Sequence, residues 1–110
     1  MASLKLLSKT FALDLTTSAT ATGLQLVPNS PTRAFIVAVV NTGTDTAAVS
    51  FGTTSSNMPV PVVPATGTSA SFVLPPEMRA PVLITVGSPD IFVKGISTGT
   101  NTVYFTLVAE

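Results

Sequence analysis

The feature that most constrains the fold is the recurrence of short apolar stretches, each closed by Gly, Pro, Asn, Asp, Ser or Thr. Stretches of this kind predict β-strands joined by turns. No window carries an apolar stripe at helical spacing. The nine prolines also argue against long helices, because a proline inside a helix removes a backbone hydrogen bond. The chain is therefore expected to be all-β.

The middle of the chain contains the strongest strand signal. Residues Arg33–Val40 are nearly continuous in apolar side chains, which predicts a strand buried on both faces or central in a sandwich. Asn41–Asp45 then turns the chain, and Thr46–Phe51 follows with alternating apolar residues. We predict that these two strands pair as a hairpin.

The C-terminal third reads as three further strands, Pro81–Val86, Ile91–Ile96 and Thr102–Val108. The short turns Gly87–Asp90 and Ser97–Asn101 separate them. Short loops between alternating strands predict a meander of adjacent antiparallel strands. In the last strand the odd-numbered apolar residues are expected on one face and the even-numbered ones on the other.

Weaker signals fill the rest of the chain. Leu24–Val27 and Ser69–Leu74 are expected to be short strands. Pro75–Arg79 is a connection, with one turn of helix beginning at a proline as an alternative. The prolines of Met58–Pro64 place that segment at a sheet edge or in a loop. Gly95 indicates a β-bulge or a close approach of another group.

The N-terminal region is patterned less clearly. Phe11, Leu13 and Leu15 alternate as in a strand, whereas Thr16–Thr22 is uncharged and of low complexity. We therefore expect residues 1–22 to be an N-terminal arm or a first strand.

About eight strands at regular spacing are typical of a β-sandwich or a small barrel. Residues 23–110 are expected to form a single antiparallel β-sandwich or a small jelly-roll-like barrel, in a chain whose 110 residues suit one domain.

Charge is scarce in this sequence. Charged residues make up 9% of the chain, against about 25% in a typical soluble domain, and the formal net charge is zero. A monomer with this few charges is poorly protected against association. We therefore expect copies of the chain or a partner to cover much of its surface. The alternative is a protein that is simply sparing with charge. The basic residues form no stripe that could neutralise phosphates, so no nucleic-acid partner is expected; they are Lys5, Lys9, Arg33, Arg79 and Lys94.

Membrane association is not expected either. The longest apolar run, Ala34–Val40, is far shorter than the roughly 20 residues that a membrane-spanning helix requires. Lysines interrupt the apolar residues near the N-terminus, so no signal peptide is expected and the chain is read as complete and not exported.

The sequence lacks the residues of most catalytic sites. It has no His and no Cys, which excludes Ser–His triads, Cys nucleophiles and ordinary zinc sites. Asp45 and Asp90 could form a carboxylate pair, and Asn41–Asp45 could offer oxygen ligands to calcium, but Asp and Asn in such positions usually stabilise turns. We expect no enzyme activity, no cofactor and no metal.

Two further features have alternative interpretations. Tyr104 and the Phe residues could stack on sugars or bases, although core packing is the favoured interpretation. Arg79 lies beside Met78 and near two prolines. It is expected either to pair with an acid on a neighbouring subunit or to be a solvated loop residue.

Two segments carry a family resemblance. Arg33–Thr54 and Pro89–Glu110 resemble the small β-sandwich virion proteins of tailed phages, which include head decoration or cement proteins and tail or fibre-base modules. The resemblance covers less than half of the chain and rests on strand texture and turn style. It implies a non-enzymatic structural subunit, present in many copies in the virion after assembly in the host cytoplasm, and bound to a major capsid or tail protein.

The leading functional hypothesis is therefore a capsid decoration or cement subunit that stabilises the phage head as a homo-oligomer, with a trimer favoured and a dimer next. The alternative is a tail, fibre-base or receptor (carbohydrate)-binding module. The N-terminal region, the proline-rich segment and the Pro75–Arg79 connection supply the candidate protein interface. Its residues are Leu4, Leu6, Leu7, Phe11, Met58, Pro59, Pro61, Met78 and Arg79.

Overall fold

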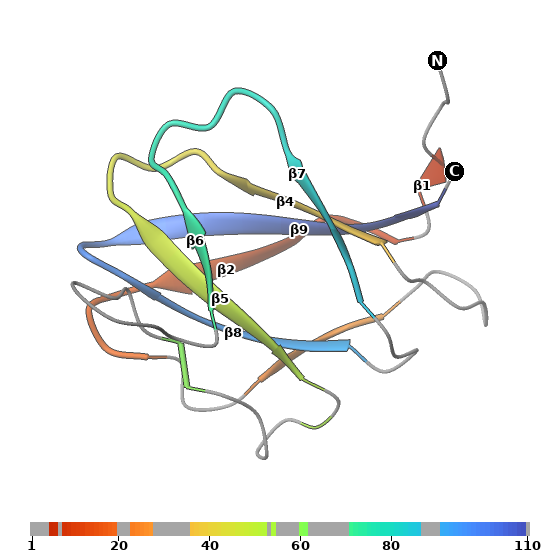
Figure 1. Ribbon diagram of the computed structural model, residues 1–110, viewed down its shortest axis with the longest axis horizontal. Helices are drawn as coiled ribbons and strands as arrows, with labels where there is room; N and C mark the ends of the chain where they lie inside the picture. Colours follow the sequence, from red (N-terminus) through yellow and green to blue (C-terminus); the bar gives the residue numbers. More distant parts are fainter. Residues whose placement is uncertain are drawn as a thin grey trace.

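The computed structural model describes residues 5–6, 8–19, 23–27, 36–52, 54, 60–61, 71–86 and 91–109. These ranges form nine strands and no helix (Figure 1). The strands are β1 (Lys5–Leu6), β2 (Phe11–Leu15), β3 (Leu24–Leu26), β4 (Ile36–Asn41), β5 (Ala47–Gly52), β6 (Phe72–Leu74), β7 (Val82–Thr85), β8 (Ile91–Ser97) and β9 (Asn101–Ala109). The expectation of an all-β chain is confirmed.

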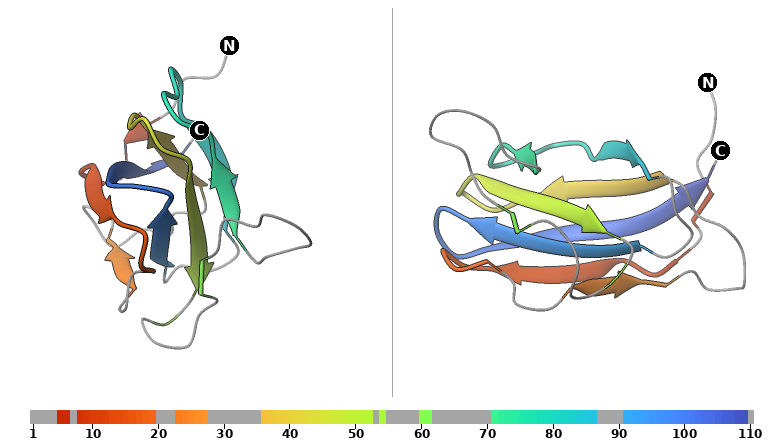
Figure 2. Two further views of the ribbon diagram at one scale, coloured as in Figure 1. Left: turned by 90° about the vertical axis from the view of Figure 1, so that its left-hand side faces the viewer. Right: turned by 60° about the horizontal axis from the view of Figure 1, so that its bottom comes forward.

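The strands form two antiparallel sheets that pack face to face (Figure 2). One sheet has the order β1-β9-β4-β7, with β2 also paired to β9, and the other has the order β3-β8-β5-β6. β1 and β2 form two successive parts of one edge, because they pair with opposite ends of β9. Between them the Ser8 hydroxyl accepts the Leu107 N–H at 2.9 Å. Each sheet therefore has four strand positions, and the predicted β-sandwich is confirmed.

The connectivity is that of a jelly roll. Strand pairs nest inside one another along the chain: β2 with β9, β3 with β8, β4 with β7 and β5 with β6. This is one long hairpin rolled up on itself. The roll is closed by the pairs β4–β9 and β5–β8, which make each sheet continuous. A double-sheet arrangement of this kind is the jelly-roll solution to burying an all-β core.

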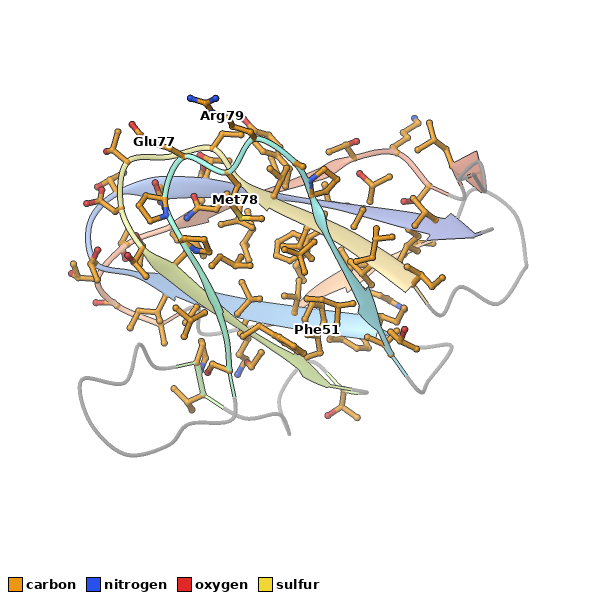
Figure 3. All side chains as sticks on the ribbon, turned by 45° about the horizontal axis from the view of Figure 1, so that its top comes forward. Phe51, Glu77, Met78 and Arg79 are labelled. Carbon is orange, nitrogen blue, oxygen red and sulfur yellow. The ribbon has the colours of Figure 1, made fainter. Side chains whose placement is uncertain are left out.

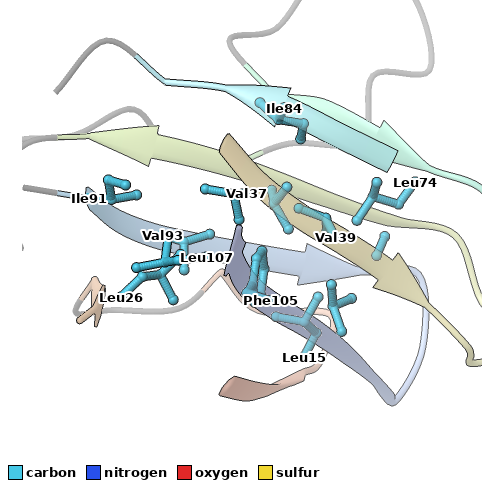
Figure 4. Packing of buried hydrophobic residues seen from close by; sticks show 13 residues of the cluster. Leu15, Leu26, Val37, Val39, Leu74, Ile84, Ile91, Val93, Phe105 and Leu107 are labelled. Atoms are coloured by element: carbon cyan, nitrogen blue, oxygen red, sulfur yellow. The ribbon is translucent and has the colours of Figure 1, made fainter. Parts of the chain in front are cut away.

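The core lies between the two sheets and is apolar (Figure 4). In β4 and β9 alternate side chains point inward, as the pleat of a strand requires, so that Val37, Phe105 and Leu107 are fully buried. Phe51 from the opposite sheet meets the ring of Phe105 edge-on, with 6.4 Å between centroids. Burying one such side chain contributes about 1.5–3 kcal/mol. The alternation predicted for the last strand is confirmed. β4 is central in its sheet, between β7 and β9, but it is fully buried on one face and only half-buried on the other.

The predicted hairpin between the two central segments is wrong. β4 pairs with β7 and β9, whereas β5 pairs with β6 and β8 in the other sheet. Residues 42–46 therefore carry the chain across the core from one sheet to the other. Both strands bury one apolar face, and they do so from opposite sides of the same core. A local pattern of two apolar strands and a polar turn is compatible with either arrangement.

The predicted C-terminal meander is wrong for the same reason. β7 and β9 lie in one sheet, and β8 lies in the other. Because consecutive strands belong to different sheets, none of them pairs with its neighbour in sequence. The turn predicted at Gly87–Asp90 lies outside the described residues. The three strands themselves are confirmed, because alternation reports which face is buried but not which strand lies alongside.

Two local predictions have clear outcomes. Pro75–Arg79 forms bends rather than a turn of helix, and Glu77 there has a φ of 55°, in the left-handed region. Gly95 pairs in regular register with Val49, so the structure supports close approach rather than a bulge. A Cβ atom at Gly95 would lie 2.5 Å from Cδ2 of Leu15, which leaves no room for a larger residue. Leu15 is the last residue of β2, which belongs to the N-terminal region and forms an edge strand of its sheet.

Candidate functional site

Two buried asparagines hold one end of the sandwich together. Asn41 ends β4 and Asn101 begins β9, and both side chains are shielded from solvent. Nδ2 of Asn101 donates to Oδ1 of Asn41 at 2.8 Å and to the backbone oxygen of Asp45 at 2.7 Å. The loop between β4 and β5 is thus tied to the start of β9.

Asn41 also holds the connection between β6 and β7. Its Nδ2 lies 3.0 Å from the oxygen of Asp45, 3.2 Å from that of Pro75 and 3.4 Å from that of Leu74. The backbone adds two bonds, from the N–H of Met78 to the oxygen of Asn41 at 2.9 Å and from Glu77 N–H to Gly43 oxygen at 2.8 Å. This is where the bends of residues 75–80 attach to the fold.

The connection between β8 and β9 packs against the same loop. The N–H of Thr98 donates to the oxygen of Thr46 at 3.0 Å, and the Ser97 hydroxyl donates to the same oxygen at 3.3 Å. The Ser97 hydroxyl oxygen in turn accepts the N–H of Gly99 at 3.2 Å. Three connections from different parts of the chain therefore form one hydrogen-bonded end.

A surface hollow of about 360 Å³ lies on this end, and we name it the threonine hollow. Its lining comes from the β4–β5 loop, the β8–β9 loop and the start of β9, and no lining residue is charged. Hydroxyl groups and one aromatic ring dominate it. The lining residues are Thr42, Gly43, Thr44, Thr100, Asn101, Thr102 and Tyr104.

Carboxylates flank the threonine hollow. The hydroxyl of Thr102 donates to Oδ1 of Asp14 at 2.9 Å, across the β2–β9 pairing. The Asp45 carboxylate packs against Gly99, where an added Cβ would lie 2.5 Å from its Oδ2. Asp90, the other half of the suggested carboxylate pair, lies outside the described residues.

A calcium site at residues 41–45 has little support in this geometry. Oδ1 of Asn41 already accepts from the Gly43 N–H at 3.1 Å and from Asn101. Within the described ranges, no three His, Cys, Asp or Glu side chains gather as a metal site would require. The side-chain oxygen of Asn41 is therefore already occupied by hydrogen bonds within this end of the fold.

A second surface lies along one long side of the sandwich, where β6 and β7 are the edge strands of the two sheets (Figure 2). Phe72 pairs with Val49 and Val82 pairs with Val39, so each projects on the core-facing side of its strand. Nevertheless Phe72 is 50% exposed and Val82 is 42% exposed. The inward faces of these two edge strands are therefore only partly covered, and we name this surface the open side.

The open side is apolar and uncharged along its strands. Val73 and Leu83, which point away from the core on the same two strands, are each 48% exposed. The charges of this region, Glu77 and Arg79, project outward from the connection, whereas Met78 turns toward the core (Figure 3). Edge strands in soluble proteins usually carry charges or are covered. β6 and β7 are short but otherwise unprotected.

The structure does not bring the described candidate interface residues together. Leu6 is 74% exposed and pairs with Val108 near the end of β9, whereas Met78 contacts Asn41, whose partner Val103 lies near the start of β9. The two therefore lie at opposite ends of the sandwich.

Phe11 is partly buried against the core, Pro61 is buried and Arg79 is exposed beside the open side. Leu4, Leu7, Met58 and Pro59 lie outside the described residues. Their part in an interface stays a prediction.

Sequence reasoning missed both surfaces. One signal was present: the triplet Thr-Gly-Thr occurs at 42–44, 66–68 and 98–100, and the first and last copies belong to loops that meet. The copy at 66–68 lies outside the described residues. The open side has no such signal, because Phe72 and Val82 read as ordinary core positions. Their exposure depends on which strands end up at the edges of the sheets.

Comparison with known proteins gives no relative. Neither a family model, nor a curated protein, nor a solved structure matches this chain. In the part of the chain that the structure describes, no helix is long and apolar enough to cross a membrane.

Proposed function

We propose that the chain is a non-enzymatic structural subunit of a virus particle, in first place a decoration or cement subunit of a tailed-phage head. The observation that carries the proposal is the open side, where Phe72 and Val82 face inward on edge strands and are nevertheless 50% and 42% exposed. Apolar surface of this kind typically marks a place where another protein binds. Burial of the open side against protein would complete the core.

The partner that fits the open side is protein rather than a charged ligand. β6 and β7 present backbone groups that pair with no further strand among the described residues, and they carry no charge. A strand or loop of another subunit can use both features, by backbone hydrogen bonding and by apolar contact. Glu77 and Arg79 give the adjoining connection one charge of each sign, so a second copy meets no net repulsion there.

The jelly-roll topology supports the proposal only as an analogy. Viral capsid proteins use this fold, but so do lectins and cupins. A fold hosts many functions, and the function resides in the surface built on it. We therefore base the proposal on the open side, together with the 9% content of charged residues. The proposed assembly is a homo-oligomer, trimer before dimer, that adds to a capsid and stabilises it by mass action.

Light scattering coupled to size-exclusion chromatography tests self-association. We expect the purified chain to form an oligomer and Leu83→Glu to shift it toward monomer, because the new carboxylate would be buried without a partner. Gln25→Glu is the matched control, since Gln25 is exposed on β3, an edge strand other than the two that form the open side. A wild-type chain that remains monomeric at high concentration would remove self-association from the proposal.

Cosedimentation with purified tailed-phage heads tests the capsid part. We expect the wild-type chain to pellet with heads and to raise the temperature at which they release DNA. A chain that oligomerises but stays in the supernatant would keep the subunit role and exclude decoration of those heads.

A second candidate function, a receptor (carbohydrate)-binding module, is favoured by a separate observation. The threonine hollow is a shallow, hydroxyl-rich surface at the loop end of the sandwich, and the described residues that line it are uncharged. Loops on a rigid β-scaffold commonly carry binding sites.

A further inference from the structure

We infer that the threonine hollow is a binding site for a neutral saccharide. The inference is independent of self-association through the open side, because the two surfaces use different residues. It gives the carbohydrate-binding alternative a location and a ligand class. The argument has three parts: the groups that line the hollow, the charges around it and the rigidity of its walls.

The lining groups match the chemistry of a sugar. A threonine hydroxyl both donates and accepts hydrogen bonds, as a sugar hydroxyl does, and four threonines line the hollow. Tyr104 adds an aromatic face against which the C–H face of a sugar ring can pack. By register Tyr104 has Ala12 and Val40 as its cross-strand neighbours, and Ala12 is a small exposed residue that cannot cover the ring. The hollow is shallow and open, with a volume of about 360 Å³, so a sugar would rest against it rather than be enclosed.

The charges select a neutral ligand over an anionic one. Among the described residues that line the hollow none is basic, so a phosphate, sulfate or carboxylate would find no counter-charge from them. Asp14 and Asp45 lie close by and would repel an anion. The Thr102 hydroxyl donates its hydrogen to Asp14, so toward a ligand its oxygen can act only as an acceptor, for example from a ligand O–H group.

The walls of the hollow are fixed before any ligand arrives. Asn41 and Asn101 tie both lining loops together through buried hydrogen bonds, which reduces the entropy that would be lost on binding. Oδ1 of Asn101 is a buried acceptor that has no hydrogen-bond partner among the described residues, and it lies against Gly43 at the wall of the hollow.

Amide chemical shifts of the 15N-labelled full chain test the inference. The neutral probes are lactose, maltohexaose and chitotetraose, and 3′-sialyllactose is the anionic counterpart of lactose. We expect at least one neutral probe to shift the amides of residues 42–44 and 100–104. We expect the sialylated probe to bind no more tightly than lactose.

Variants connect the binding to the lining groups. Thr100→Val keeps the shape of an exposed loop residue but removes its hydroxyl, and we expect roughly fivefold weaker binding. Tyr104→Leu removes the ring, with an expected loss of about tenfold, whereas Tyr104→Phe keeps the ring and most of the affinity. Thr85→Val on β7 is the matched control, exposed but outside the hollow, and should bind as the wild type does.

Three outcomes would overturn the inference. One is the absence of shifts at these amides with every neutral probe. Another is binding that Thr85→Val weakens as much as Thr100→Val does. The third is binding of the sialylated probe alone. Each of them leaves self-association untouched, because the titration reports on the hollow whether the chain is a monomer or an oligomer.

Discussion

Asn101 donates a hydrogen bond of 2.8 Å to the side-chain oxygen of Asn41, across 60 positions of sequence. The two residues begin and end neighbouring strands, and around them the loops of both sheets converge. Polar side chains that are fully buried need partners, and here the amide groups donate to backbone oxygens of two connections, β4–β5 and β6–β7. The end of the sandwich that carries the threonine hollow is therefore set by amide chemistry rather than by apolar packing.

Replacement of the two asparagines should have unequal effects on stability. Asn41→Ala removes a donor and an acceptor that serve several backbone groups, and we expect a loss of about 2–4 kcal/mol in the free energy of unfolding. Asn101→Ala should cost less, about 1–2 kcal/mol, because Oδ1 of Asn101 has no hydrogen bond to lose among the described residues. Urea denaturation measures both. Equal losses would show that the hydrogen-bond account of this end is wrong.

Substitution of Gly95 should reveal its close contact with Leu15. A Cβ there would lie 2.5 Å from Cδ2 of Leu15, so Gly95→Ala is expected to cost about 1–3 kcal/mol. Leu15→Val shortens the opposing side chain and should recover part of that loss. The measurement is a double-mutant cycle by urea denaturation, and strictly additive effects would rule out the contact.

Glu77 offers a stabilising substitution. Its φ of 55° is uncommon for a residue with a side chain, and glycine adopts it without steric cost. Glu77→Gly should therefore raise the free energy of unfolding by about 0.5–1 kcal/mol. Arg79→Gly is the control, because Arg79 has no such φ and should gain nothing. A lower melting temperature for Glu77→Gly would contradict this prediction.

Two phenylalanines that contact the same ring should respond differently to truncation. Phe105→Ala empties a fully buried position and should cost about 3–5 kcal/mol at any protein concentration. Phe72 is half exposed at the open side, so Phe72→Ala should cost less in a dilute monomer. If copies of the chain cover the open side, that cost should grow as protein concentration rises. Thermal unfolding across a concentration series distinguishes the two cases.

The candidate interface shows where sequence reasoning stops. The prolines and the cation of the Pro75–Arg79 connection predict a protein contact, and the structure places this connection beside the open side. The exposed apolar residues next to it, Phe72 and Val82, were assigned to strands but not to a surface. Exposure of an apolar strand residue depends on whether its strand is central or at an edge, and the local pattern does not contain that information.

The sequence by itself determined that the chain is made of short strands and which side of each strand is apolar. Alternation suffices for this, because successive side chains of a strand point to opposite faces. Only the tertiary structure decided which strands lie side by side. The loop at residues 42–46 would have the same polar composition whether it joined two paired strands or led from one sheet to the other. Which strands pair depends on the whole set of strands, because every apolar face must be covered by another. The jelly-roll arrangement covers these faces except at the open side.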